Sequence, residues 1–301
     1  MNLRCEGCGA QLTLEPELRT ALCPYCGSTS IVERPAETDR PTPAFALGFA
    51  VSRGQVHESA RAWLGRRSWF AKSGVRKAAL EHLQGIYLPA YLYSSVAHVD
   101  YRAEIGEHYT ETETYSDTEN GKKVTKTRRV TKTEWHPLSG RLDDYVADTL
   151  VTASKGLPNS ELGAVEPFDL RQLRRFQPAL LSGWLAEEPT LTQPQCLELA
   201  RAEMRRSVES RLRGFLPGDE QRGLSHTLEV AQESLELCLL PVWVLAARYA
   251  PDSPPMRIVV NGQTGKTTGK VPLSWTKIAA AALGAALVAG GLVYLLLLQK
   301  P

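Results

Sequence analysis

A long uncharged run near the end of the chain, Ile278–Leu298, most constrains what this sequence can fold into. The run contains no proline, and as a helix it would be about 31 Å long, close to the ~30 Å hydrocarbon core of a bilayer. A helix that packs on a soluble core normally has one polar face, and this run has none. The sequence therefore predicts a C-terminal transmembrane anchor over residues 274–301, with the lipid bilayer as a partner and a buried soluble helix as the alternative.

Length, charge and the first residues limit the remaining possibilities. The 301 residues allow one sizeable folded core plus a small module. The formal net charge of +2 provides no overall attraction for nucleic acid. The first residues lack the apolar segment of a signal peptide. We therefore expect a single-pass, tail-anchored protein whose bulk is cytoplasmic.

Four of the six cysteines form two pairs with metal-ligand spacing, Cys5 with Cys8 and Cys23 with Cys26. Each pair has two intervening residues, which lets both thiolates reach one ion. Four thiolates fill a tetrahedral shell and leave no position for a reacting water, so the predicted Zn²⁺ is structural. The pattern predicts a zinc ribbon over residues 1–33, in which a strand over Gln11–Leu14 pairs with one near Thr20–Leu22. A disulfide pair or a redox Cys-x-x-Cys motif is the alternative.

The charges around these cysteines favour a protein partner over nucleic acid. Arg4 and Arg19 are outnumbered by four glutamates, Glu6, Glu15, Glu17 and Glu33. A zinc ion held by four thiolates is also net negative, so this surface would repel phosphate. Residues 34–44 are rich in proline and poor in apolar residues, which indicates a linker.

Residues 45–273 are expected to form a cytoplasmic α+β domain that is rich in antiparallel hairpins. The clearest hairpin signal is Asn120-Gly121, a typical two-residue turn between alternating, threonine-rich segments over residues 99–135. An acidic arm precedes the turn, with Glu104, Glu107, Glu111, Glu113, Asp117 and Glu119. A basic arm follows it, with Lys122, Lys123, Lys126, Arg128, Arg129 and Lys132. The two-residue turn predicts a register in which Glu113 lies opposite Arg128. The hairpin is interpreted as solvated, or as a docking surface for a protein or for anionic lipid.

Periodicity predicts further elements on either side of this hairpin. An amphipathic helix is expected over residues 193–216, with an apolar stripe formed by Leu197, Ala200, Met204, Val208, Leu212 and Phe215. Strands are expected over residues 86–93 and 235–250. Shorter helices are expected over residues 55–64 and 75–84. A second hairpin is expected to turn at Asn261-Gly262.

Residue patterns that would indicate catalysis are absent from the sequence. The run Val260-Asn-Gly-Gln-Thr-Gly-Lys-Thr267 is similar to a phosphate-binding P-loop, but Val260 stands where that loop needs glycine, and no helix is expected next. The six histidines are scattered singly. Cys196 lies near a helix start but is interpreted as an inert buried thiol. We expect no enzyme activity.

The order of several short motifs resembles a bacterial family of zinc-ribbon membrane proteins. These are often labelled primosomal-protein-N′ (replication factor Y)-like or TFIIB-type zinc-ribbon proteins. Besides the four cysteines, the resemblance rests on Ile86-Tyr-Leu-Pro89, Trp135-His-Pro-Leu-Ser-Gly140, Ala153-Ser-Lys155, Glu166-Pro-Phe-Asp-Leu170, Leu181-Ser-Gly183, Leu240-Pro-Val-Trp243, Val260-Asn-Gly-Gln-Thr-Gly265 and Pro272-Leu-Ser-Trp-Thr-Lys277. The chain lacks helicase motifs, so the replication label is interpreted as a misnomer.

The resemblance implies an adaptor at the cytoplasmic face of the bacterial inner (plasma) membrane. It implies recruitment of phage-shock-protein-A-like (ESCRT-III-like) proteins to the membrane in envelope stress, with SPFH-type proteins as further partners. Only Cys5, Cys8, Cys23 and Cys26 carry over as functional positions. A membrane-tethered nucleic-acid binder is the alternative function. Small residues four apart in the predicted anchor, Ala282, Ala286 and Gly290, are compatible with a homo-oligomer.

Overall fold

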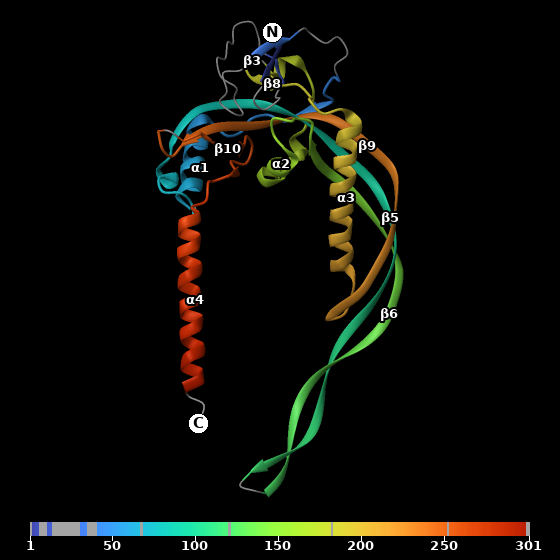
Figure 1. Ribbon diagram of the computed structural model, residues 1–301. Helices are drawn as coiled ribbons and strands as arrows, with labels where there is room; N and C mark the ends of the chain where they lie inside the picture. The colour runs from blue at the N-terminus through green and yellow to red at the C-terminus, as the bar shows by residue number, and fades with distance from the viewer. Residues whose placement is uncertain are drawn as a thin grey trace. The chain divides into compact units, whose positions relative to one another are not determined.

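The computed structural model describes residues 2–5, 11–13, 31–34, 41–66, 69–119, 122–181, 183–251 and 253–298 (Figure 1). The chain divides into two compact units, each built from segments that are distant in the sequence. Unit 1 comprises Met1–Tyr91, Leu150–Cys196 and Glu236–Pro301. Unit 2 comprises Leu92–Thr149 and Leu197–Leu235.

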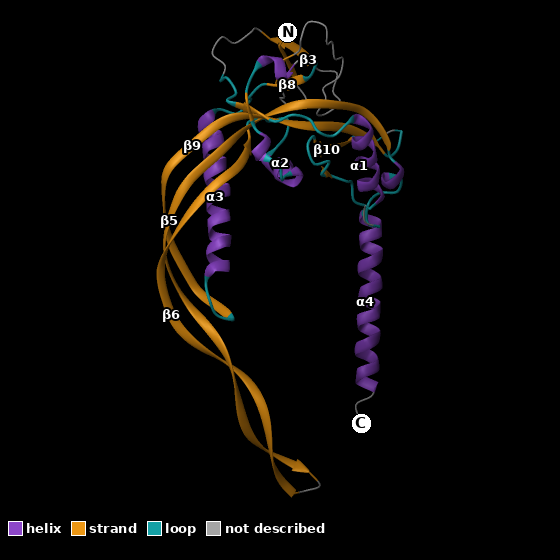
Figure 2. Cartoon of the chain, turned by 180° about the vertical axis from the view of Figure 1, so that it is seen from behind, coloured by secondary structure: helices purple, strands orange, loops and turns teal. Residues whose placement is uncertain are grey.

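Three very long strands dominate the chain, β5 (Ala79–Glu119), β6 (Lys122–Thr152) and β9 (Glu220–Arg248) (Figure 2). They have 41, 31 and 29 residues, whereas strands in globular proteins usually have about 3–10. Each strand contributes residues to both units. The predicted fold class, an α+β domain between a zinc ribbon and a transmembrane helix, is therefore wrong. The described chain is mainly one large mixed sheet.

The sheet of unit 1 has the strand order β11-β10-β9-β5-β8-β2-β1-β3 among the described strands. β10 (Met256–Asn261) lies antiparallel to both β9 and β11 (Thr267–Gly269). β8 (Leu185–Glu187) pairs in parallel with β5, with Ile86 opposite Leu185. A short strand, β4 (Phe45–Ala46), lies parallel to β9 and antiparallel to β7 (Arg174–Arg175). The sheet is mixed because these short strands join it from distant parts of the chain.

Helix α1 (Arg53–Gly65) covers part of this sheet and confirms the helix expected over residues 55–64. Ser52 begins it with a capping box, in which the Ser52 hydroxyl accepts from the backbone N–H of Gln55 and the Gln55 side chain accepts from the backbone N–H of Ser52. Its apolar face is fully buried against β9 and β10, in a core that includes Val56, Ala60, Leu64, Trp243, Leu245, Ile258 and Val260. Burial of this face, rather than helix propensity, supplies most of its stability.

The helix expected over residues 75–84 is not formed. A 3₁₀ turn, η1 (Val75–Lys77), precedes β5, which begins at Ala79. Ala79–Gln84 are good helix formers, but Glu81 in this segment forms an ion pair with Arg248 of β9 at 3.2 Å. Pairing with a neighbouring strand overrides local propensity here.

The remaining elements of unit 1 are short helical segments and three N-terminal strands. The helical segments are α2 (Asn159–Val165), η2 (Leu170–Gln172) and η3 (Pro178–Leu181). β1 (Asn2–Cys5) pairs antiparallel with β2 (Gln11–Thr13) and β3 (Ile31–Arg34), and β2 pairs with β8. The expected partner of the Gln11 strand, residues 20–22, lies outside the described residues.

In unit 2, β5 pairs with β6 and with β9, and helix α3 (Gln193–Phe215) belongs to this unit from Leu197 onward. Alternate residues of β5 are buried: Tyr93, Ser95, Ala97, Val99, Tyr101 and Ala103. The buried face of α3 carries Ala200, Met204, Val208 and Leu212, which confirms the predicted helix and its stripe. The stripe ends differently from the prediction, because Phe215 is 56% exposed whereas Leu216 is buried.

The last helix is α4 (Trp275–Leu298). Within the part of the chain that the structure describes, no helix is long and apolar enough to cross a membrane. This finding overturns the predicted single-pass anchor over residues 274–301 and the inner-membrane location that followed from it. The prediction of a tail-anchored transmembrane chain is wrong for the same reason.

Candidate functional site

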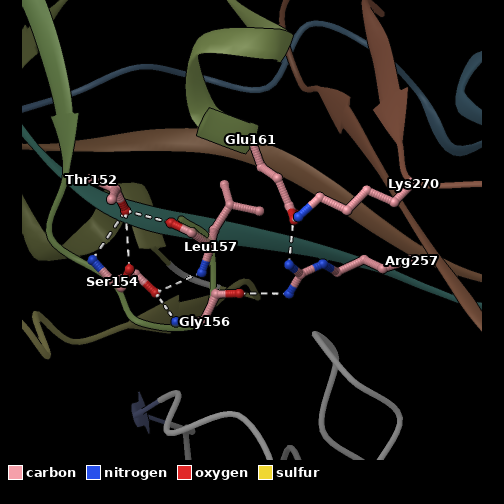
Figure 3. Close-up of polar contacts among 7 residues, drawn as sticks. All are labelled: Thr152, Ser154, Gly156, Leu157, Glu161, Arg257 and Lys270. Carbon is pink, nitrogen blue, oxygen red and sulfur yellow. Dashed lines mark hydrogen bonds and ion pairs between the residues drawn. The ribbon is translucent and has the colours of Figure 1, made fainter. Parts of the chain in front are cut away.

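Thr152, at the end of β6, and the loop that follows it, residues 153–157, form a hydrogen-bonded polar group in unit 1 (Figure 3). Thr152 and Ser154 are 2% and 1% exposed. The Thr152 hydroxyl donates to the carbonyl of Leu157 at 2.8 Å and accepts from the backbone N–H of Ser154 at 3.1 Å. Backbone groups in a buried loop need such partners, because an unpaired one is costly. The Thr152 hydroxyl therefore provides hydrogen-bond partners for backbone groups of this loop that would otherwise be buried without them.

Ser154 also contacts a buried carboxylate that the sequence analysis did not single out. Its hydroxyl donates to Oε1 of Glu187 at 2.5 Å and accepts from the backbone N–H groups of Gly156 and Leu157, at 2.8 and 3.2 Å. Glu187 lies in β8 and is 2% exposed. A serine beside a carboxylate can indicate a nucleophile, but this hydroxyl is inaccessible and its hydrogen bonds are all occupied. The pair holds the loop against β8.

An ion-pair cluster closes the other side of the same loop (Figure 3). Arg257 of β10 donates to the carbonyl of Gly156 and to Oε2 of Glu161, both at 2.6 Å. Lys270 lies 3.5 Å from the other oxygen of Glu161. The Glu161 side chain is only 12% exposed and that of Arg257 24%. These residues tie α2 to β10, and Arg257 and Glu161 are 96 residues apart in the sequence.

The segment that resembles a P-loop forms a strand, a turn and a second strand. Asn261 ends β10 and is fully buried, and its amide donates to the carbonyls of Val165 and Pro167. Its side-chain oxygen accepts from the backbone N–H groups of Gln263 and Thr264. A Cβ at Gly262 would lie 2.7 Å from the carbonyl oxygen of Pro241, so glycine is required there. The glycines of this motif serve a turn, as predicted, and nucleotide binding is not supported.

The two cysteines of the described core have unreactive thiols. Cys196 and Cys238 are both fully buried. Burial raises the pKa of Cys196 to about 11 and that of Cys238 to about 12. At neutral pH both are therefore protonated, and the thiolate is the nucleophilic form. The structure confirms that Cys196 is buried, as expected from the sequence.

The predicted zinc ligands lie mostly outside the described residues. Cys5 ends β1, whereas Cys8, Cys23 and Cys26 fall in segments that the structure does not describe. Among the described residues, no group of three or more His, Cys, Asp or Glu side chains could hold a metal ion. The description of this chain as a zinc-ribbon membrane protein is therefore not supported by the described part. The four-cysteine zinc site itself stays a prediction.

The distal part of unit 2 is a two-stranded hairpin formed by the acidic arm of β5 and the basic arm of β6 (Figure 1). The predicted pairing of Glu113 with Arg128 is observed as an ion pair at 3.1 Å. Lys132 contacts Glu111 at 2.6 Å and Glu113 at 3.2 Å. These contacts lower the pKa of Glu113 and raise the pKa of Lys132, through hydrogen bonds between the partners. The turn residues Asn120 and Gly121 lie outside the described residues.

The two faces of this hairpin differ in chemistry because side chains alternate along a strand. One face carries the ion pairs together with Tyr109 and Tyr115, which are 45% and 41% exposed. The guanidinium of Arg128 lies 5.7 Å from the Tyr115 ring centroid on this face. The other face of β5 has only hydroxyl residues over the same length, Thr110, Thr112, Thr114 and Ser116, all exposed. We call the first the charged face and the second the threonine face.

At the base of the hairpin, β9 begins beside β5. The backbone N–H of Asp219 donates to the carbonyl of Gly106 at 2.9 Å, and the Asp219 carboxylate accepts from the N–H of His108 at 2.8 Å. Arg222 lies 2.5 Å from Glu104, and its guanidinium lies 3.9 Å from the Trp135 ring centroid. A cation over an aromatic ring is favourable. These contacts fix where the three-stranded part ends and the two-stranded part begins.

Nearer the centre of unit 2, a polar cluster links the sheet to α3. Arg201 donates to both oxygens of Glu233, at 2.9 and 2.6 Å, and the Tyr93 hydroxyl donates to Oε1 at 2.7 Å. The hydrogen bonds from Arg201 are the main reason that the pKa of Glu233 falls to about 2. Tyr93 is fully buried, and its pKa is raised, chiefly by desolvation. The cluster fixes α3 on its sheet.

Comparison with known proteins gives one distant relative. The chain is 25% identical over 257 residues to "Uncharacterized protein YdjG" of Bacillus subtilis (strain 168). The aligned region covers 83% of this chain and 68% of that protein. No protein-family model matches the chain. No solved structure matches it either. The relative's name assigns no activity, so the choice among functions depends on the geometry above.

Proposed function

We propose that this protein is a non-enzymatic adaptor that binds other proteins through the two-stranded hairpin of unit 2. The observation that supports this proposal is the hairpin itself. It places two oppositely charged arms and two exposed tyrosines, Tyr109 and Tyr115, on one face. Tyrosine and arginine are enriched where proteins bind one another. A long two-stranded arm of this kind has little use in stabilising a core, because both of its faces are exposed.

The chemistry of the described nucleophiles favours a binding role over catalysis. Ser154 is buried and uses its hydroxyl to hold a loop. Cys196 and Cys238 are buried thiols with raised pKa values. Arg257 and Glu161 neutralise each other beside the same loop. Each polar group that resembles catalytic machinery is thus occupied in a structural contact.

The family resemblance in the sequence suggests which partners to test. It implies phage-shock-protein-A-like (ESCRT-III-like) proteins and SPFH-type proteins. The acidic arm and the basic arm of the hairpin would select a partner by electrostatic complementarity. Such complementarity affects association rate and specificity more than final affinity. Binding through the arms should therefore weaken as ionic strength rises.

The test is a binding measurement between the purified full-length chain and a purified phage-shock-protein-A-like protein, with and without a charge reversal in the basic arm. Arg128→Glu/Lys132→Glu should weaken binding at least tenfold. The matched control is Arg206→Glu/Arg213→Glu on α3, where both arginines are also exposed and ion-paired. This control should bind like the wild type.

Two results would contradict the proposal. One is equal binding by the arm variant and the wild type, which would remove the hairpin from the interface. The other is no binding of either candidate partner by the wild type at low salt. Circular dichroism of each variant verifies that the sheet is intact.

A further inference from the structure

The strand edges of the hairpin lack a neighbour over the length of both arms. Among the described strands, β6 pairs with β5 alone. β5 is covered on its other side by β9, but only up to Gly106 and His108, where Asp219 makes the last contacts. From Tyr109 onward, the described sheet places no strand beside the outer edge of β5. Both outer edges therefore present backbone N–H and C=O groups that can pair with another strand.

The charges of the two arms decide which strand fits each edge. On the charged face, β5 presents Glu111 and Glu113, and β6 presents Arg128 and Lys132. A strand added beside β6 would bring its side chains close to the basic residues, and one beside β5 would approach the acidic residues. Opposite charges across neighbouring strands stabilise a sheet and like charges destabilise it. The β6 edge suits an acidic strand and the β5 edge suits a basic one.

The chain itself contains both strands. We propose that the hairpin binds a second copy of this chain, with the outer edge of β6 in one copy paired to the outer edge of β5 in the next. The paired segments are residues 122–132 and 109–119, which are of equal length. In this order acidic and basic strands alternate across the growing sheet, and neighbouring strands stay antiparallel. The threonine faces also line up, and exposed β-branched residues favour such a sheet.

The same charges disfavour the symmetric alternatives. Pairing β6 with β6 would place Arg128 and Lys132 beside their own copies, and pairing β5 with β5 would do the same for Glu111 and Glu113. A two-fold dimer formed by either route would therefore place like charges side by side. The contact that remains joins two different surfaces, and a contact of this kind does not close a dimer but continues from copy to copy.

This inference rests on the proposed function, because it uses the same hairpin, and it names one partner for it. An adaptor that assembles through its arms would present many copies of its binding surfaces together. Avidity then raises the effective affinity for any partner that is itself an assembly.

The test is the mass of the full-length chain in solution at low and high salt, measured by light scattering and analytical ultracentrifugation. At low salt the wild type should form species several times the 33.1 kDa of one chain. High salt should dissociate them, because exposed charges are screened. A variant with two acidic arms, Arg128→Glu/Lys132→Glu, and one with two basic arms, Glu111→Lys/Glu113→Lys, should each stay at the mass of one chain.

Mixing these two variants provides the decisive control. An acidic hairpin and a basic hairpin have complementary edges, so the mixture should assemble although neither variant does alone. A variant that carries all four substitutions should assemble by itself but exclude the wild type, because its arms are exchanged. Circular dichroism verifies that each variant is folded, since exposed charges contribute little to folding. The variant with all four substitutions is the stricter control, because it keeps opposite charges across its own two arms.

Hydrogen exchange distinguishes edge pairing from another mode of assembly. Assembly should slow amide exchange in residues 109–119 and 122–132 relative to the dissociated chain. A wild type that keeps the mass of one chain at low salt would overturn the inference, and so would unchanged exchange in both segments. Self-assembly can fail in this way while arm-dependent binding of other proteins persists, in which case the proposed adaptor function stands alone.

Discussion

Two ion-pair clusters of similar composition have opposite surroundings in the two units. In unit 1, Arg257 and Glu161 form a pair whose side chains are 24% and 12% exposed. In unit 2, Arg128 and Glu113 form a pair whose side chains are 63% and 34% exposed. The first pair also binds a backbone carbonyl of a buried loop, whereas the second lies on an arm with two exposed faces. Burial therefore decides whether an arginine–glutamate pair maintains the fold or is available to a partner.

The largest expected effect is the loss of the buried arginine. Arg257→Ala leaves the Glu161 carboxylate and the carbonyl of Gly156 without their main donor. Removing one partner of a buried pair typically costs about 3–5 kcal/mol, and Lys270 compensates in part, so we expect a loss near 3 kcal/mol. Chemical denaturation of the full-length chain measures this free energy of unfolding. A loss below 1 kcal/mol would show that this pair behaves like an exposed one.

A smaller loss is expected when the buried loop loses its hydroxyl. Ser154→Ala removes the donor to Glu187 and the acceptor of two backbone N–H groups. Leaving buried polar groups unsatisfied costs about 1–3 kcal/mol. The same denaturation experiment measures it, with Ser94→Ala as the control, because Ser94 is only half-buried. Equal stability of the two variants would contradict the role assigned to Ser154.

Loss of the contact between Arg201 and Glu233 in unit 2 should destabilise the chain less than loss of Arg257, and the loss of stability should depend on pH. The pKa of Glu233 is lowered to about 2, so the stabilisation from its contact with Arg201 is fully present above the ordinary pKa of 4.5. It is lost as the pH falls from about 5 towards 2, where the carboxyl becomes protonated. Arg201→Ala should lower the thermal midpoint clearly at pH 7 and much less at pH 3. A deficit that does not change with pH would mean that Arg201 acts by packing alone.

The smallest effect is expected at the exposed pair of the hairpin. Arg128→Ala should change the free energy of unfolding by at most about 1 kcal/mol, because water and salt screen exposed pairs. Denaturation at low and high salt would detect any larger contribution. A loss comparable to that of Arg257→Ala would remove the distinction between the two clusters.

Where the structure agrees with expectations from the sequence, the signals are local. The helix over residues 193–216 was predictable because its apolar residues recur every three or four positions. The helix that begins at Arg53 was predictable for the same reason, because Val56 and Ala60 are four residues apart and share one face. The hairpin after β10 was predictable from Asn261-Gly262, but its loop is longer than a two-residue turn, because Asn261 still belongs to β10 and pairing resumes at Thr267. The arms around residue 120 were predictable from alternation and opposite charge, and the ion pair of Glu113 with Arg128 confirms them.

The buried contacts were not predictable, because their partners are distant in the chain. Glu187 meets Ser154 only because β8 joins the sheet in parallel beside β5. Arg257 meets Glu161 only because α2 packs near β10. Residues 75–84 have helical propensity, yet most of them join β5, since pairing with β9 outweighs that propensity. The sequence likewise contains no signal for strands as long as β5, because a proline at position 89 suggests an interruption.

The sequence by itself determined the helices α1 and α3, the turn after β10, and the charged hairpin, because each depends on residues within one turn or one strand pair. Only the tertiary structure decided that the chain is mainly a large mixed sheet, which serine and which arginine are buried, and where β9 leaves the edge of β5 open. Those features depend on which distant segments of the chain pair with one another. Strand pairing uses backbone N–H and C=O groups, which all residues except proline have in common, so the residue types alone do not reveal which strands are neighbours.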